Sequence, residues 1–380
     1  FFQAEDGIRD LVRSRGLGDV YKRQFFIPLL MLRKNKFFFP VLLLLLFIIM
    51  VLAIAFGAVH ISGENMLGAI QHFFLGEKPG NIHEAVFLQL RLPRVLLCPI
   101  TGAILAVSGV LMQGLFRNPI VEPDLVGTSA GAAFGASFVF VMAAKMSPEV
   151  KSLAGPLLVP LFAFAGGLLA TFMVYSLAKN AKRVSIMSLL LVGIAVNAIG
   201  LSGTGFMSYI ARDPQARSIT FWNLGTFSGA SWLHVFIVGS VAAIIFIVSL
   251  RYSKQLNALL LGEEEATYLG VDTKKLKRRV MILTTAMVSV ATAFVGVISF
   301  MGLIVPHVMR LLIGSDNKRL LPASMITGAF LLTLADMGAR LLLAPAEIPI
   351  GIITSLVGAP IFIILLKKSN VLQQKGGYNA

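Results

Sequence analysis

The residues of this chain that could do chemistry are the few ionisable side chains inside or beside its apolar stretches. Asp336 and Arg340, in "LADMGARL", stand four positions apart, so a helix would place them on one face where they can neutralise each other. His60, His72 and His83 share one polar stretch without helical spacing, which raises contact with haem but is more typical of solvated loop residues. No group of His, Asp and Glu recurs on neighbouring predicted helices, which disfavours a membrane enzyme with a metal site.

The sequence also lacks a site for nucleotide hydrolysis. No G-x-x-x-x-G-K-[ST] phosphate loop occurs in the 380 residues, so the chain cannot itself supply ATP hydrolysis. We predict no catalytic residue, no cofactor and no metal ligand. The chain is therefore not expected to be an enzyme.

The elements that must position these residues are membrane helices. Apolar residues make up 57% of the chain and charged residues 13%, well below the share in a soluble domain. At roughly 20 apolar residues per span, the length allows about ten spans. The net charge of +15 comes from basic clusters at the ends of apolar runs, which a lipid bilayer with anionic headgroups explains better than nucleic acid. The predicted fold class is all-α, a polytopic membrane protein.

Ten apolar runs predict the spans 37–58, 95–116, 126–146, 155–177, 186–207, 232–250, 280–299, 301–314, 320–342 and 350–366. The seventh and eighth are hard to separate, because only Pro306 and His307 interrupt the run. Basic residues concentrate in alternate loops, above all between Arg251 and Arg279, so the positive-inside rule places both termini in the cytoplasm. We expect a multi-pass protein of the cytoplasmic membrane.

Two end segments stand apart from a single predicted membrane domain, residues 31–368. Residues 1–30 mix charges without an apolar core, and as far as Gln24 they resemble a translated sequencing adapter, which would make Met31 the natural start. The alternative is a disordered cytoplasmic extension. Residues 369–380 are predicted to form a short cytoplasmic tail.

A weak internal repeat is formed by three positions in each half that share their spacing, Gly109, Pro119 and Gly127 in the first and Gly296, Pro306 and Gly314 in the second. The first set begins on a predicted inward-running span and the second on an outward-running one. This arrangement is expected of two inverted repeats around a central pathway.

Three predicted helices carry a stripe of small or weakly polar residues. The stripes are Gly102, Ala106, Gly109 and Gln113 on the second span, Gly193, Asn197, Gly200 and Thr204 on the fifth, and Gly351, Ser355, Gly358 and Phe362 on the tenth. On the second span the stripe predicts close helix packing. On the fifth and tenth, packing and the wall of a wide solute pathway are equally compatible with the pattern.

The longest predicted cytoplasmic loop, residues 254–279, contains two short amphipathic turns separated by Gly262. Their apolar positions are Leu256, Leu259, Leu260, Ala266, Leu269 and Val271. An apolar stripe on a hydrated loop suggests a docking surface for a partner protein. The alternative is a connecting helix that lies on the membrane surface.

Several stretches of the chain, in order, resemble the FecCD family, the permease subunits of ABC importers for iron–siderophore complexes, haem and cobalamin. They are "RLPR", "SGVLMQGLFRNPIVEPDLVGTSAGA", "FWNLGTFSGASW", "LGEEEATYLGVD", "FMGLIVPHVMRLLIG", "LADMGARL" and "EIPIGIITSLVGAPIF". The resemblance implies a bacterial inner-membrane protein of ten helices with two inverted four-helix units. It also implies a second permease subunit (the same chain or a homologue), two cytoplasmic ATPases and an external binding protein as partners, and an iron complex as solute.

The resemblance assigns roles to three groups of residues. The fifth and tenth helices would line the translocation pathway, with Gly193, Asn197, Gly200, Gly351, Ser355 and Gly358 on the wall and Ser185, Ile186 and Met187 near the cytoplasmic constriction. The ATPases would dock on the loop at Leu256, Leu259, Leu260, Gly262, Glu263, Ala266, Leu269 and Gly270. The binding protein would dock through Arg91, Arg94 and Arg340, although anchoring to headgroups or pairing of Arg340 with Asp336 is the alternative.

Two other functions stay open from the sequence. A cobalamin importer permease would share the same motifs, because apolar pathway walls do not distinguish the solutes. A secondary transporter also combines inverted repeats with broken helices. Against it stand the predicted coupling loop and the lack of an unpaired carboxylate deep in a predicted span.

Overall fold

The computed structural model describes residues 36–57, 61–143, 155–180, 183–184 and 186–376. The leader predicted over residues 1–30 lies outside this range. The helices are α2 (Phe38–Ala55), α3 (Gly63–Leu75), α4 (Ile82–Val86), η1 (Phe87–Arg91), α5 (Leu92–Phe116), η2 (Pro123–Val126), α6 (Thr128–Met142), η4 (Gly155–Leu157), α8 (Leu158–Leu177), α9 (Ile186–Ile210), α10 (Gln215–Asn223), α11 (Trp232–Arg251), α12 (Ser253–Leu261), α13 (Glu263–Tyr268), α14 (Thr273–Val295), α15 (Met301–Ile313), α16 (Asn317–Leu341) and α17 (Ile350–Gly376).

The all-α prediction is confirmed. Among the described residues, seven helices are long and apolar enough to cross a membrane, and three shorter apolar helices cover 128–142, 301–313 and 350–365. Each of these ten helices overlaps one of the ten predicted spans. Two-residue strands, β1 (Lys179–Asn180) and β2 (Arg183–Val184), form an antiparallel pair between α8 and α9, with Lys179 opposite Val184.

Three helix boundaries differ from the prediction. One π-helical turn, η1, joins α4 to α5, so a single helical segment of 35 residues runs over 82–116 rather than starting at 95. Asp272 caps the start of α14 by accepting the N–H of Lys275, so this helix begins about two turns before the predicted span. At the other end of the chain α17 continues to Gly376, so the predicted tail is helical at its start.

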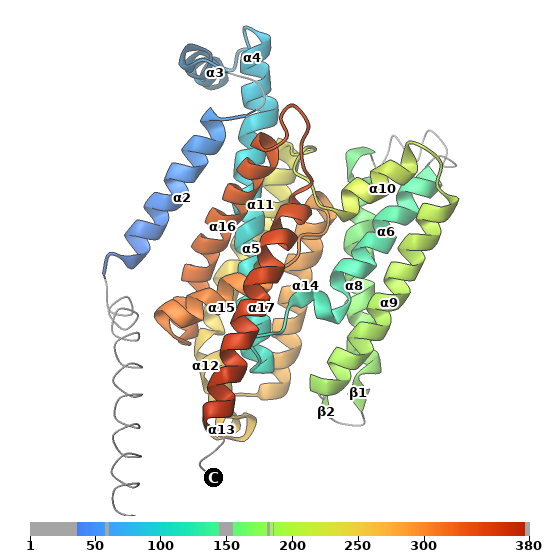
Figure 1. Ribbon diagram of the computed structural model, residues 1–380, viewed down its shortest axis with the longest axis vertical. Helices are drawn as coiled ribbons and strands as arrows, with labels where there is room; N and C mark the ends of the chain where they lie inside the picture. Colours follow the sequence, from blue (N-terminus) through green and yellow to red (C-terminus); the bar gives the residue numbers. More distant parts are fainter. Residues whose placement is uncertain (1–35, 58–60, 144–154, 181–182, 185, 377–380) are drawn as a thin grey trace, which may run out of the picture.

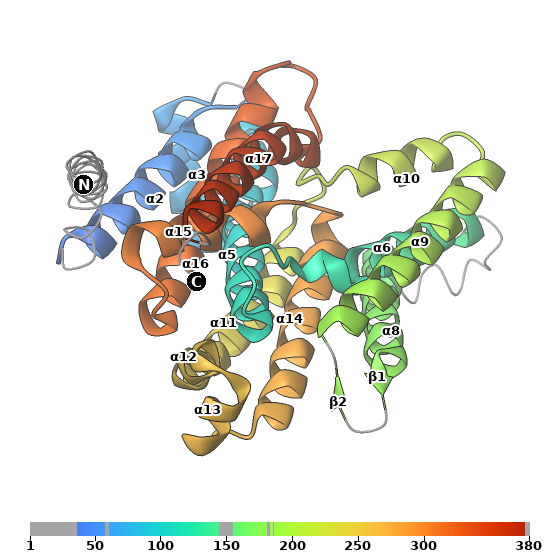
Figure 2. The same ribbon diagram turned by 60° about the horizontal axis from the view of Figure 1, so that its bottom comes forward.

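The centre of the fold is α5, whose residues are almost all buried. It packs against α11, α14, α15 and α16, which surround it in both views (Figures 1 and 2). The small stripe predicted on this helix explains the close approach. A Cβ added at Gly102 would overlap the carbonyl oxygen of Gly328, and one at Gly109 would overlap that of Gly302. Gln113 closes the same contact by donating from Nε2 to the carbonyl oxygen of Leu303 at 3.1 Å.

Two sets of four helices follow each other along the chain, and the first helix of each set packs against the other set. We call the sets the two four-helix units. The first unit is α5, α6, α8 and α9, and the second is α14, α15, α16 and α17. Helix α5 packs against α15 and α16 of the second unit, and α14, the corresponding helix of the second unit, packs against α6 and α8 of the first. This reciprocal packing is what two inverted repeats predict.

The Gly/Pro spacing noted in the sequence does not mark equivalent positions of the two units. Gly109 lies inside α5, whereas Gly296 ends α14 with φ of 76°. Pro306 lies within α15, whereas Pro119 lies between α5 and η2. The shared spacing is therefore not the structural basis of the repeat.

The molecule has two ends, which we name by the helices found there. Helices α3 and α4 lie at the upper end of Figure 1, and we call this the α3 end. Helices α12 and α13 lie at the lower end, together with the last residues of α17, and we call this the α13 end.

Candidate transport pathway and coupling surface

The stripe on α9 that was predicted to line a pathway faces the inside of the subunit. A Cβ at Gly193 would overlap the carbonyl oxygen of Leu125, and one at Gly200 would press on Ala130 at 2.9–3.0 Å. The side chain of Asn197 donates to the carbonyl oxygen of Asp124 at 3.0 Å. These residues pack α9 against η2 and α6, so helix packing, the alternative left open by the sequence, describes them.

The stripe on α17 also makes internal contacts. A Cβ at Gly351 would overlap the carbonyl oxygen of Leu224. The same oxygen accepts the N–H of Gly351 at 2.9 Å. A Cβ at Gly358 would lie 2.6 Å from Cβ of Phe300, a non-glycine residue with φ of 68°. Ser355 is half-buried on the same helix. The predicted pathway glycines of α17 are therefore sites where this helix closely approaches segments of its own subunit.

The opposite faces of the two helices are apolar and exposed. On α9 and α17 the large exposed apolar side chains are Met187, Leu191, Ile194, Ile199, Leu201, Phe206, Tyr209, Ile210, Leu356, Val357, Ile363 and Ile364. Of the residues predicted at the constriction, Met187 belongs to this surface, Ile186 is the first residue of α9, and Ser185 lies outside the described residues. We call these two faces the α9–α17 surface.

The predicted coupling loop, residues 254–279, folds as two short helices, α12 and α13, which meet at Gly262, followed by the first two turns of α14. This glycine has φ of 151°, and Gly270, with φ of 82°, ends the second turn before α14. Both conformations favour glycine, which explains the residue type at each position. Asn257 holds α12 in place, because its Oδ1 accepts the N–H of Asn317 at 2.8 Å and its Nδ2 donates to Asp316 at 2.7 Å.

The apolar stripe predicted on this loop is only partly available to a partner. Leu256, Leu259 and Ala266 are fully buried in the core of this chain, so they are anchoring residues and the prediction that they form a docking stripe is wrong. Leu260 is 38% exposed and Leu269 is 63% exposed. The stripe holds the loop against α5 and α16 because one face of each short helix must be covered.

The exposed apolar side chains at the α13 end form a separate patch. They are Leu260, Leu261, Tyr268 and Leu269, and we call them the α12–α13 patch. Charged residues flank these side chains in the sequence, and one ion pair fixes α13 to α14, with Glu263 Oε1 2.6 Å from Lys277 Nζ. At the start of α14 the backbone N–H of Lys275 lowers the pKa of the exposed Asp272 carboxyl.

The three arginines predicted to dock a binding protein are buried. Arg94 Nη2 lies 2.9 Å from Asp336 Oδ1, and Arg94 Nη1 lies 2.8 Å from Glu347 Oε1. Arg340 Nε lies 3.2 Å from the second oxygen of Asp336, and Arg340 Nη2 donates to the carbonyl oxygen of Ala53. The internal pairing of Arg340 with Asp336, left open by the sequence, is the observed arrangement.

Arg91 is buried by a different route. It donates from Nη1 to the carbonyl oxygen of Ile54 at 2.9 Å, close to the C-terminal end of α2. A buried guanidinium that neutralises internal carboxylates or helix-end carbonyls is not presented to an external protein. The prediction that Arg91, Arg94 and Arg340 form a docking surface is therefore corrected.

The histidines of the polar stretch do not form a ligand group in the described part of the chain. His72 Nδ1 lies 2.8 Å from Glu84 Oε2, which ties α3 to α4. No cluster of three or more His, Cys, Asp or Glu side chains that could hold a metal ion occurs among the described residues. His60 lies outside them.

Sequence reasoning missed two contacts that join distant segments. Glu347, in the segment before α17, is the second carboxylate of the Arg94 cluster. Glu122, just before η2, accepts the N–H of Phe300 at 2.9 Å and so links the two four-helix units. The only signal in the sequence for either contact was a carboxylate among apolar residues. Such a signal does not show which residue the carboxylate contacts.

Comparison with known proteins gives consistent results. The chain is similar to the hemin transport system permease protein of Yersinia pestis, with 40% identity over 295 residues, 77% of this chain and 85% of that protein. It is similar to the cobalamin import system permease protein of Halobacterium salinarum, with 40% identity over 282 residues, 74% of this chain and 73% of that protein. A solved inward-facing structure, described as a metal-chelate type ABC transporter, superposes with a TM-score of 0.75 at 30% identity and covers 88% of this chain and 100% of its own.

A protein-family comparison matches residues 44–368 to the FecCD transport family. This range includes both surfaces described above and all ten apolar helices, apart from the first turn or two of α2. The chain belongs to the FecCD transport family.

Proposed function

We propose that this protein is a permease subunit of an ATP-binding cassette importer that moves an iron complex, a siderophore or haem, across the cytoplasmic membrane of a bacterium. The observation that carries the proposal is the family match over residues 44–368, supported by relatives whose names describe permeases for hemin and cobalamin. The chain performs no covalent chemistry, and the energy for transport comes from separate ATPase subunits.

The α13 end is the cytoplasmic end in this proposal. Exposed basic residues gather there, namely Arg251, Lys254, Lys274, Lys275, Arg278 and Arg279. Lys and Arg are enriched on the cytoplasmic side of membrane proteins, which supports this orientation. Both chain termini would then be cytoplasmic, and the α3 end would face the external binding protein.

Each of the two permease subunits would dock one cytoplasmic ATPase on its α12–α13 patch. The patch combines exposed apolar side chains with a base that is fixed to the core by Leu256, Leu259 and Asn257. A rigid base is what force transmission from an ATPase requires, because a loose loop would absorb the movement. The docking residues proposed are Leu260, Leu261, Tyr268 and Leu269, with Gly262, Glu263 and Gly270 shaping the turn.

The solute pathway would form between two permease subunits along the α9–α17 surface. Both faces are apolar and exposed in the single subunit, and large exposed apolar areas mark interaction sites or lipid contact. A second permease, either the same chain or a homologue, would cover part of this surface. The remainder would line the pathway, with Met187 near its cytoplasmic end.

The binding protein would approach the α3 end through exposed charges rather than through the three buried arginines. Arg212 and Arg217, beside and within α10, are exposed, and α10 lies in the half of the molecule toward the α3 end (Figure 1). An exposed guanidinium can bind a carboxylate at two points. We therefore assign docking to these two residues.

A cobalamin importer is the second candidate, because a relative with the same identity to this chain carries that name. A secondary transporter is less well supported. The carboxylate of Asp336, which lies within a long span, is neutralised by Arg94 and Arg340 and is not free to carry a proton or sodium ion.

The test is reconstitution of the permease in proteoliposomes with ATPases and a binding protein encoded beside its gene. Uptake of labelled ferric siderophore, haem and cobalamin is measured with and without ATP inside the vesicles. ATP-dependent uptake of an iron complex supports the proposal. ATP-dependent uptake of cobalamin alone would select the second candidate, and uptake driven by an ion gradient without ATPases would contradict both.

A further inference from the structure

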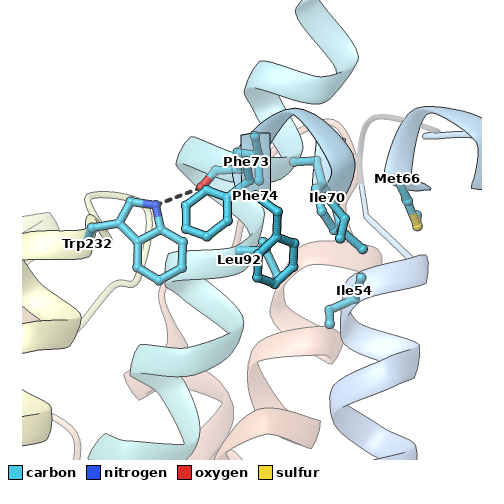
Figure 3. A pocket seen from close by; sticks show the side chains of 9 residues that line it. Ile54, Met66, Ile70, Phe73, Phe74, Leu92 and Trp232 are labelled. Carbon is cyan, nitrogen blue, oxygen red and sulfur yellow. Dashed lines mark hydrogen bonds between the residues drawn. The ribbon is translucent and has the colours of Figure 1, made fainter. Parts of the chain in front are cut away.

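An apolar pocket of about 440 Å³ opens between four helices at the α3 end (Figure 3). Its walls come from α2, α3, the segment that leads into α5, and the start of α11. The lining residues are Ile54, Met66, Ile70, Phe73, Phe74, Phe87, Leu88, Leu92 and Trp232. The size is in the range of small-molecule sites.

The chemistry of the pocket selects a hydrocarbon ligand. Every lining residue is aliphatic or aromatic or carries a thioether, so the walls offer no charge and no free polar partner to a solute. The indole N–H of Trp232 donates to the carbonyl oxygen of Leu88 at 3.0 Å, as the dashed line in Figure 3 shows, and is therefore already used. An iron chelate or a peptide carries polar groups that this pocket could not satisfy.

The position of the pocket selects a membrane lipid as the source of the hydrocarbon. Ile54 lies near the end of α2, a candidate span that exposes most of its apolar surface, and Trp232 is the first residue of the candidate span α11. The pocket is thus at the level where spans end, and tryptophan is enriched at this boundary of a bilayer. Lipid that covers the exposed face of α2 would therefore lie next to the pocket wall formed by Ile54.

Helix α3 supports the same assignment. It is amphipathic, and Leu67, Phe73, Phe74 and Leu75 are exposed on a helix too short to span a bilayer. Such a helix lies in the interface with its apolar side in the acyl region. Phe73 stacks on Trp232 with ring centroids 6.4 Å apart, which joins this interfacial helix to the end of α11.

We infer that this pocket binds one acyl chain of a membrane phospholipid and that α3 and Trp232 together fix the α3 end of the protein in the bilayer interface. Bound lipid would fill a gap between α2 and the rest of the subunit that side chains leave open. The inference does not depend on which solute the protein moves.

The test uses the full chain in detergent micelles with phosphatidylcholine brominated on its acyl chains, a contact quencher of tryptophan fluorescence. The chain has two tryptophans, so Trp222→Phe leaves Trp232 as the only reporter. We expect the lipid to quench Trp232 in a saturable manner at low lipid content. Quenching that rises only in proportion to the total lipid in the micelles would overturn the inference, because it would report general contact.

A matched pair of variants on α3 separates the pocket from the rest of the helix. In the Trp222→Phe background, Ile70→Asp places a carboxylate in the pocket wall, and we expect it to weaken the saturable quenching at least about tenfold, because a charge in an apolar lipid site is costly. Leu67→Asp makes the same kind of change on the same helix outside the pocket and should leave it intact.

A third variant covers the case in which Ile70→Asp does not fold. Phe74→Asp changes an exposed residue that also lines the pocket, so it should fold and should also remove the saturable quenching. Equal quenching in all three variants would overturn the inference. If the pocket instead binds part of a soluble protein, the brominated lipid should show no saturable quenching of Trp232. That result would also overturn the inference.

Discussion

Arg94 and Asp336 are separated by 242 positions in the sequence and form a buried ion pair, with Nη2 of Arg94 2.9 Å from Oδ1 of Asp336. Arg340 and Glu347 complete the cluster, so two guanidinium groups face two carboxylates. The pair connects α5 to α16, and Glu347 brings in the segment before α17. Each of these charges loses its hydration on burial, and without a partner of opposite charge this loss would strongly destabilise the folded protein.

We predict that Asp336→Asn lowers the free energy of unfolding by about 3–5 kcal/mol, because it leaves two buried guanidinium groups with too little negative charge. Glu347→Gln is the matched change at the more exposed carboxylate, and we expect a clearly smaller loss. The measurement is the unfolding of the purified protein in detergent by heat. Equal losses in the two variants would contradict the view that Asp336 is the centre of the cluster.

The fold could be predicted from the sequence further than the site could. Runs of about 20 apolar residues have one stable solution in a bilayer, so the ten helices followed from composition and length. Helices α3 and α10 were missed because they are short and carry mixed polarity. The early start of α14 was missed because its first turns, with "TKKLKRR", are too charged to resemble a span.

The site could be predicted only as candidate faces. A stripe such as Gly193, Asn197 and Gly200 shows that one side of a helix is small, but small residues suit contact with a neighbouring helix and contact with a solute equally well. The structure decides between them because Leu125 and Ala130 cover that side. In the same way, the periodicity of Leu256 and Leu259 predicts an apolar face without showing that the chain itself covers it.

The crossing of α5 with α15 depends on the absence of a side chain at Gly109. We predict that Gly109→Ala destabilises the protein by about 1–3 kcal/mol, because the added Cβ would overlap the carbonyl oxygen of Gly302 and the helices must move apart. Gly338→Ala, within α16, is the control, since a Cβ there meets no atom within 4 Å. It should be neutral or slightly stabilising in a helix. Thermal unfolding of both variants provides the comparison, and an unaffected Gly109→Ala would show that the contact is not tight.

The α12–α13 patch yields a prediction about coupling. The double variant Leu260→Glu with Leu269→Glu should insert and fold normally, because both side chains are exposed, but should lose transport-linked ATP hydrolysis when assembled with the ATPases. Leu259→Glu should instead reduce the amount of folded protein, since a carboxylate would be buried without a partner.

Folded yield and ATPase activity in proteoliposomes are measured for both variants. If the double variant couples normally, the ATPases dock elsewhere. If Leu259→Glu folds like the unchanged protein, the assignment of Leu259 as an anchoring residue is wrong.

The α9–α17 surface predicts the position of the contact between permease subunits, and the single buried Cys98 makes it testable by cross-linking. In a Cys98→Ala background, Leu201→Cys and Val357→Cys place thiols on the exposed faces of α9 and α17, and Val196→Cys places one on the buried face of α9. We expect a short bifunctional maleimide to join Leu201→Cys or Val357→Cys chains into dimers in native membranes, whereas Val196→Cys should remain a monomer, because its thiol is covered by its own subunit.

If the partner is a homologous chain, it needs its own engineered cysteine, and the product then has the summed mass of the two different chains. Efficient cross-linking through Val196→Cys, or its absence at every exposed position with either partner, would show that the subunits meet on another face.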